Sequence, residues 1–113
     1  MNNIRLERLN HTYLEEISNI LLKEIKNEYL KFVTITGVKI SNDLSFAKVF
    51  YTSLNEDKKK TQEELNKSSG FIRKLLAQYI NLRKTPELKF IYDNTYEYAT
   101  HIEELIEKVN NDK

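Results

Sequence analysis

The side chains best suited to chemistry in this chain are lysines and arginines, and they are concentrated in its middle. Residues 58–92 carry nine basic residues against three glutamates, a net charge of +6, whereas residues 93–113 carry two basic and six acidic residues. The planar guanidinium of arginine bridges phosphate oxygens and stays charged at any relevant pH. This segregation of charge favours an anionic partner, although charge runs also serve simply as a solvated surface.

Residues for catalysis or metal binding are poorly represented. The chain has no cysteine, which excludes disulfides, zinc–thiolate sites and thiol nucleophiles. His11 and His101 are far apart in sequence and fit no metal-ligand spacing. Because Gly37 and Gly70 are the only glycines, no glycine-rich phosphate loop is possible. We therefore predict a binding protein that is not an enzyme and that uses no catalytic residue, metal or cofactor.

The composition is that of one globular domain. The chain has 113 residues, of which 40% are hydrophobic and 31% charged. We predict a single domain over residues 1–113 with a short polar tail at about 110–113. No apolar run is long enough to cross a bilayer and no targeting segment is evident, so the expected location is the cytoplasm.

The elements that position the basic residues follow from periodicity. Apolar residues recur every three or four positions over residues 4–26, which predicts a long helix. Residues 32–41 and 45–53 read as the two strands of a hairpin. A second helical pattern begins at Thr61, which is expected to be its N-cap, with Glu64 in capping-box spacing. Residues 87–92 alternate as a strand, and residues 95–109 predict a last helix.

Two residues mark predicted breaks in helical structure in the second half of the chain. Gly70 lies inside the second helical pattern and predicts a bend at residues 68–70, where two helices pack closely. Pro86 biases Thr85 away from the helical conformation, so the helix ends before it and a strand can begin. Six apolar residues of this half are expected to face the core: Phe71, Ile72, Leu75, Leu76, Tyr79 and Ile80.

The predicted order is therefore α-β-β-α-kink-α-β-α. The second strand runs antiparallel to the first. A right-handed crossover through two helices is expected to lay the third strand parallel to the first, on its other side, so that the first strand is central. The fold class is α+β, a three-stranded sheet with helices on one face.

Four blocks of the sequence carry a resemblance to a known family. They are Arg5-x-x-Arg8, Val33 to Val49 with Ser41-x-Asp43-Leu44, Ser69-Gly70-Phe71-Ile72-Arg73-x-x-Leu76, and Leu82-Arg83-x-x-Pro86-Glu87-Leu88-x-Phe90-x-Tyr92-Asp93. In this order and spacing, over residues 4–109, the chain resembles the ribosome-binding factor A family of bacterial small-subunit assembly factors. The resemblance implies a type II KH-like fold without catalysis. It also implies binding to 16S ribosomal RNA in the immature 30S subunit, and a role in maturation, rRNA processing and cold adaptation.

The chain departs from the family pattern at two places. Ser68 stands where the family usually has alanine at the kink. Asn27-Glu28-Tyr29 replaces a common Asp-Pro-Arg, which removes one RNA-facing arginine. The chain also lacks the GxxG loop with which KH domains clamp a nucleic-acid backbone. RNA contacts must therefore come from side chains and helix ends.

We expect eight basic residues to form the RNA-binding surface: Arg5, Arg8, Lys48, Lys67, Arg73, Lys74, Arg83 and Lys84. For Arg73 a salt bridge to a nearby carboxylate is the alternative role. The expected partners are 16S rRNA and the free or immature 30S subunit, bound by a monomer with no membrane involved. The alternative function is a protein-interaction adaptor whose hairpin or acidic C-terminal helix engages a protein without direct RNA contact.

Overall fold

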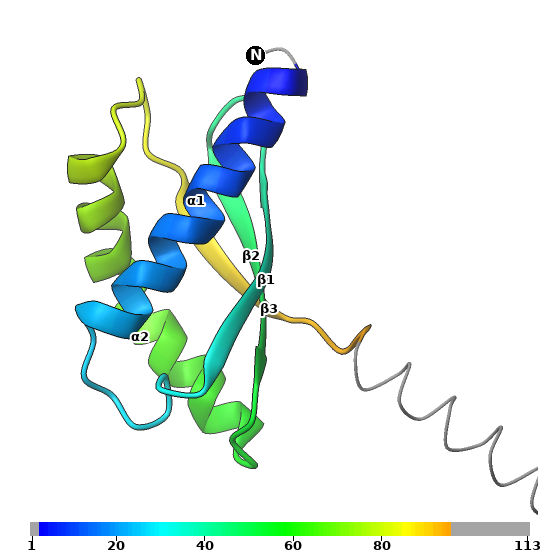
Figure 1. Ribbon diagram of the computed structural model, residues 1–113, viewed down its shortest axis with the longest axis vertical. Helices are drawn as coiled ribbons and strands as arrows, with labels where there is room; N and C mark the ends of the chain where they lie inside the picture. Colours follow the sequence, from blue (N-terminus) through cyan, green and yellow to red (C-terminus); the bar gives the residue numbers. More distant parts are fainter. Residues whose placement is uncertain (1–2, 96–113) are drawn as a thin grey trace, which may run out of the picture.

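The computed structural model describes residues 3–95 (Figure 1). Along the chain it contains α1 (Asn3–Lys23), β1 (Val33–Ile40), β2 (Phe46–Ser53), α2 (Lys58–Tyr79) and β3 (Glu87–Tyr92). The two helices lie on one face of a three-stranded sheet, α1 against β1 and α2 against β3. The predicted α+β class and the helices on one face are confirmed. The helix predicted over residues 95–109 lies outside the described residues, apart from Thr95.

The core lies between the helices and the inward face of the sheet. Tyr13 and Ile17 of α1 are fully buried, as are Ile72 and Leu76 of α2. The inward residues of β2 are also buried at alternate positions: Ala47, Val49 and Tyr51. Fully burying one large apolar side chain contributes about 1.5–3 kcal/mol, so these positions account for much of the stability of the fold. The predicted helical stripe and strand alternation are confirmed.

Polar contacts fix α2 to the sheet. The Tyr51 hydroxyl donates to the side-chain carbonyl of Gln62, and the amide of Gln62 donates to the carbonyl oxygen of Phe90 at 3.0 Å. Tyr51 also packs edge-on against Tyr92, with ring centroids 5.6 Å apart. Burial raises the pKa of the Tyr51 hydroxyl above its ordinary value. The helix is thus joined to both β2 and β3.

The predicted order of the strands is wrong. The order in the sheet is β1-β2-β3, with β2 central, and β3 pairs parallel with β2 rather than with β1. The physical reason is that one helix, α2, connects β2 to β3. A single helix returns the chain to the end at which β2 began, so the next strand runs parallel to β2. Two separate crossover helices, as expected from the sequence, would have favoured the other pairing.

The start of α2 also differs from the prediction. The helix begins at Lys58, and its N-cap is Asp57, whose carboxylate accepts a hydrogen bond from the backbone amide of Lys60 at 3.0 Å. Thr61 lies within the first turn, fully buried, and its hydroxyl donates to the carbonyl oxygen of Asp57. Aspartate is as good an N-cap as threonine or better, and it stands four residues earlier in the sequence.

Gly70 does not mediate close packing. The helix is continuous through residues 68–70, although Figure 1 shows the two halves of α2 running in different directions. Gly70 is exposed, and a Cβ atom at this position would meet nothing within 4 Å. Phe71 and Tyr79, expected in the core, are 46% and 54% exposed. The predicted close contact at the glycine is therefore wrong, and only the bend within one helix remains.

Replacing Gly70 should stabilise the protein. Gly70→Ala removes backbone freedom from the unfolded chain without a clash, so the free energy of unfolding should rise by about 0.5–1 kcal/mol. Urea denaturation measures this change. Leu76→Ala is the matched control in the same helix and should lower stability by about 2–5 kcal/mol, because it opens a cavity in the core. A Gly70→Ala variant less stable than the wild type would show that the bend needs glycine.

Candidate nucleic-acid interface

Three segments far apart in sequence meet at one end of the molecule. They are the start of α1, the loop at residues 80–86 after α2, and the β1–β2 turn at residues 41–45, all at the top of Figure 1. Five of the eight predicted RNA-binding residues stand on these segments or on the last turns of α2, and all five are exposed. We call this set the basic end: Arg5, Arg8, Lys74, Arg83 and Lys84.

The β1–β2 turn is rigid. The Asp43 carboxylate accepts hydrogen bonds from the Ser45 hydroxyl at 2.7 Å, the Ser41 hydroxyl at 2.8 Å and the Ser45 backbone amide at 3.0 Å. These bonds, with a smaller contribution from the charge of Lys84, lower the pKa of Asp43 to about 2. Leu44 adopts a positive φ of 61° and buries its side chain. The turn is therefore a fixed support beside Lys84.

Arg73 anchors the loop that carries Arg83 and Lys84. Its Nε and Nη2 atoms donate to the carbonyl oxygen of Thr85 at 3.2 and 2.8 Å, directly before the buried Pro86. Within the described part of the chain, Arg73 thus makes a bidentate contact to a backbone carbonyl and not the salt bridge to a carboxylate that was its alternative role. Arg73 also lies near the buried Tyr13, whose pKa burial raises to about 12, with the arginine charge acting in the opposite direction. Arg73 is thus a positioning residue for the basic end.

The loop and the turn are also joined through the sheet. The backbone amide of Glu87, at the start of β3, donates to the carbonyl oxygen of Ser45 at 3.1 Å. This bond begins the parallel pairing of β3 with β2. The parallel pairing therefore brings Arg83 and Lys84 beside the β1–β2 turn.

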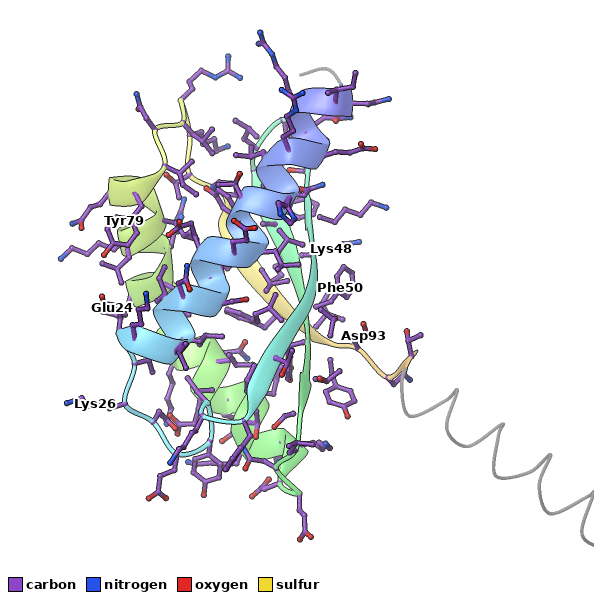
Figure 2. The ribbon with its side chains drawn as sticks, in the orientation of Figure 1. Glu24, Lys26, Lys48, Phe50, Tyr79 and Asp93 are labelled. Carbon is purple, nitrogen blue, oxygen red and sulfur yellow. The ribbon has the colours of Figure 1, made fainter. Side chains whose placement is uncertain are left out.

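Lys48 lies on the uncovered face of the sheet, close to the basic end. It points away from the helices, on the same side as Phe50 (Figure 2). A hollow of about 450 Å³ runs from this side around the β1 edge to the first turns of α1, where it is lined by Leu6, Glu7 and Asn10. Asn10 accepts a hydrogen bond from the backbone amide of Ile40 at 2.8 Å, so α1 covers the end of the edge strand.

Lys67 does not join the basic end. It lies twelve residues before the end of α2, about 18 Å along the helix axis. Its ammonium group is 3.6 Å from the carboxylate of Glu64, which also pairs with Lys60 at 3.3 Å. A hydrogen bond from Asn27, followed by these lysines, lowers the pKa of Glu64. Lys60, Glu64 and Lys67 thus form a cluster of ion pairs on one helix.

The first three lysines of the basic segment, Lys58, Lys59 and Lys60, lie at the opposite end of the molecule, where α2 begins (Figure 1). Lys58 donates to the carbonyl oxygen of Ser53 at 2.7 Å and lies 5.0 Å from the ring centroid of Tyr92. Lys60 lies 5.9 Å from the ring centroid of Tyr29. The net charge of residues 58–92 is therefore divided between the two ends and Lys89 on the sheet, and does not form one patch.

The segment Asn27-Glu28-Tyr29, which departs from the family pattern, has a structural role. Asn27 accepts a hydrogen bond from the backbone amide of Tyr29 and donates to Glu64, both at 2.9 Å. Asn55 in turn donates to the carbonyl oxygen of Tyr29 at 2.6 Å. The residues that replace the family arginine thus join the α1–β1 loop to α2.

Sequence reasoning missed two further lysines, Lys39 and Lys89. Both are exposed and lie directly opposite Lys48, one on each neighbouring strand. Lys39 could have been found from the outward positions of the hairpin. Lys89 could not, because its place beside Lys48 depends on the strand order of the sheet.

In the part of the chain that the structure describes, no three acidic or histidine side chains gather as metal ligands. Within residues 3–95, no helix has both the length and the apolar character to span a bilayer.

Residues 5–106 match the family described as ribosome-binding factor A. A protein of that name from Staphylococcus epidermidis is 43% identical over 116 residues, and the alignment covers all of both chains. Another from Legionella pneumophila is 46% identical over 79 residues, which are 70% of this chain and 64% of the relative. The aligned part thus spans just under two thirds of the Legionella protein.

Solved structures share the fold. The crystal structure of ribosome-binding factor A from Thermus thermophilus superposes with a TM-score of 0.71 at 18% identity, over 77% of this chain and 94% of that chain. A homology model of the Thermus factor, fitted into a cryo-EM map of a 30S–RbfA complex, superposes with a TM-score of 0.65 at 19% identity. That match covers 76% of this chain and 92% of the other. The KH-like α+β fold is confirmed.

Arg73 and Arg83 should differ in their effect on stability. Arg73→Ala removes both hydrogen bonds to the Thr85 carbonyl and should lower the free energy of unfolding by about 1 kcal/mol. Arg83→Ala is the matched control and should change it by less than about 0.5 kcal/mol, since Arg83 is exposed. Urea denaturation compares the two variants. Equal stability of both would show that the contact to Thr85 does not hold the loop.

The Asp43 turn should contribute to stability in a pH-dependent way. Its pKa falls from an ordinary 3.8 to about 2 on folding, so its contribution is complete above about pH 4 and disappears as the pH falls through 2. The stability difference between the wild type and Asp43→Ala should therefore shrink over this range. Denaturation at a series of pH values measures it, and a difference independent of pH would contradict the hydrogen-bonding scheme of the turn.

Proposed function

The chain belongs to the ribosome-binding factor A family, and from this premise we propose that it binds the immature 30S ribosomal subunit through 16S rRNA and assists its maturation. The proposal extends to rRNA processing and cold adaptation, performed by a cytoplasmic monomer made of a single domain. The observation that carries it is the basic end, where five exposed cations from α1, α2 and the following loop gather. The Thermus factor supports the choice of partner, because its fitted model belongs to a 30S–RbfA complex.

The basic end suits a phosphate backbone. Phosphate contacts fix the position and orientation of a protein on RNA without reading its sequence. Arginine and lysine side chains supply such contacts by charge-assisted hydrogen bonds. Their supports are rigid here, because Asp43 fixes the turn and Arg73 fixes the loop. Cations held at fixed separations match one arrangement of rRNA strands better than another.

The function follows from this selectivity and needs no chemical step. A protein that binds one conformation more tightly shifts the population of the RNA toward it, by as much as the difference in affinity. Binding to the immature arrangement would hold it while the rest of the subunit assembles. When the subunit matures and this arrangement disappears, affinity falls and the factor leaves.

Removing charge from the basic end should weaken binding and reduce its salt dependence. We expect Arg83→Ala/Lys84→Ala to bind immature 30S particles less tightly. The slope of log K against log salt should fall by about two units, one for each phosphate that the variant no longer binds. Sedimentation of the protein with the particles across a salt series measures both quantities.

The matched control removes the same charge from the opposite end. Lys26→Ala/Lys59→Ala should bind like the wild type, because Lys26 and Lys59 lie where α1 ends and α2 begins. An Arg83→Ala/Lys84→Ala variant that is folded and keeps both affinity and slope would rule out these two residues as RNA contacts. A shallow slope for the wild type itself would favour a protein-interaction adaptor, since apolar contacts release no counterions.

A further inference from the structure

Three lysines form a row across the uncovered face of the sheet. Lys39 of β1 pairs with Lys48 of β2, and Lys48 pairs with Lys89 of β3. All three are exposed. Paired residues of neighbouring strands point to the same side, so the three ammonium groups share the face on which Figure 2 shows Lys48. At about 4.8 Å between strands, the row is about 10 Å wide.

This arrangement is unfavourable in the free protein. Like charges directly opposite each other destabilise a pair of strands. Two glutamates stand beside the row: Glu7 shares the hollow with Lys39 and Lys48, and Glu87 lies two residues before Lys89 on β3. Among the described residues, neither glutamate forms an ion pair with a lysine of the row. The row is therefore a concentration of positive charge that an anionic ligand would relieve.

Aromatic rings stand among these lysines. Phe46 and Phe50 occupy the positions on either side of Lys48 along the same face of β2. The ammonium group of Lys89 lies 4.6 Å from the ring centroid of Phe46. Gly37 is the partner of Phe50 on β1, and a Cβ atom there would lie 3.8 Å from the Phe50 ring. Because glycine has no side chain, β1 places none beside this flank of the ring.

Lysines alternating with rings on a flat surface suit single-stranded RNA. Unpaired bases stack on aromatic faces while the phosphates between them contact cations. A duplex hides its bases from such rings, and an acidic protein segment has no bases to stack. We propose that the uncovered face of the sheet, with Lys39, Lys48, Lys89 and Phe50, binds a single-stranded segment of RNA. This inference rests on the proposed RNA-binding function and adds a second contact surface to the basic end.

The test is binding of a fluorescein-labelled oligouridylate to the full chain, measured by anisotropy across a salt series. Lys48→Gln/Lys89→Gln should weaken binding and lower the magnitude of the salt slope by about 1.4, as expected for two single-strand phosphates. Phe50→Leu should weaken binding about tenfold through loss of one stacked base. Lys26→Gln/Lys59→Gln is the matched control and should bind like the wild type. Urea denaturation should show that the lysine variant is at least as stable as the wild type.

Competitors distinguish the kinds of ligand. Unlabelled oligouridylate should displace the labelled strand at much lower concentration than duplex RNA, inorganic polyphosphate or polyglutamate. Equal displacement by all four, with no effect of Phe50→Leu, would show a general anion surface and overturn the proposal. Oligouridylate binding that is unchanged in Lys48→Gln/Lys89→Gln would overturn it as well. If this occurs while 30S binding keeps its steep salt dependence, the proposed function stands and only the second surface is refuted.

Discussion

The parallel pairing of β3 with β2 is the constraint on which both surfaces depend. It follows from α2, whose 22 residues return the chain to the end at which β2 began. The same pairing starts with the bond between Glu87 and Ser45, which sets the loop carrying Arg83 and Lys84 beside the β1–β2 turn. It also places Lys89 opposite Lys48. With β3 at the other edge, next to β1, the basic end and the row of lysines would both be dispersed.

The lysines and arginines have two kinds of role. Some form contacts that support the fold, and others face outward. Lys60 and Lys67 share the carboxylate of Glu64, and Lys58 binds the carbonyl of Ser53. Arg73 is used in the same way, on the carbonyl of Thr85. The exposed cations of the two proposed surfaces are concentrated at one end and on one face. Net charge along the sequence does not reveal this division.

The sequence predicted local structure well and non-local structure poorly. The stripe of α1 and the alternation of β2 follow from periods of 3.6 and 2, and residues 87–92 match β3. Strand order, in contrast, depended on whether one helix or two separate β2 from β3, and Gly70 suggested a break that hydrogen bonding does not show. The start of α2 was misplaced because two good capping residues, Asp57 and Thr61, stand one turn apart. Five of the eight predicted RNA-binding residues gather at one end, whereas the role of Arg73 depends on a contact across twelve residues that no local pattern shows.

The absence of cysteine allows a direct test of the proposed contact between the basic end and rRNA. Single-cysteine variants Arg83→Cys and Lys59→Cys, each carrying a tethered Fe(II)–EDTA group, can be bound to immature 30S particles and the rRNA cleavage mapped. We expect strong, localised cleavage of 16S rRNA from position 83 and little from position 59. Strong cleavage from position 59 with none from position 83 would contradict it, because the opposite end of the molecule would then face the RNA.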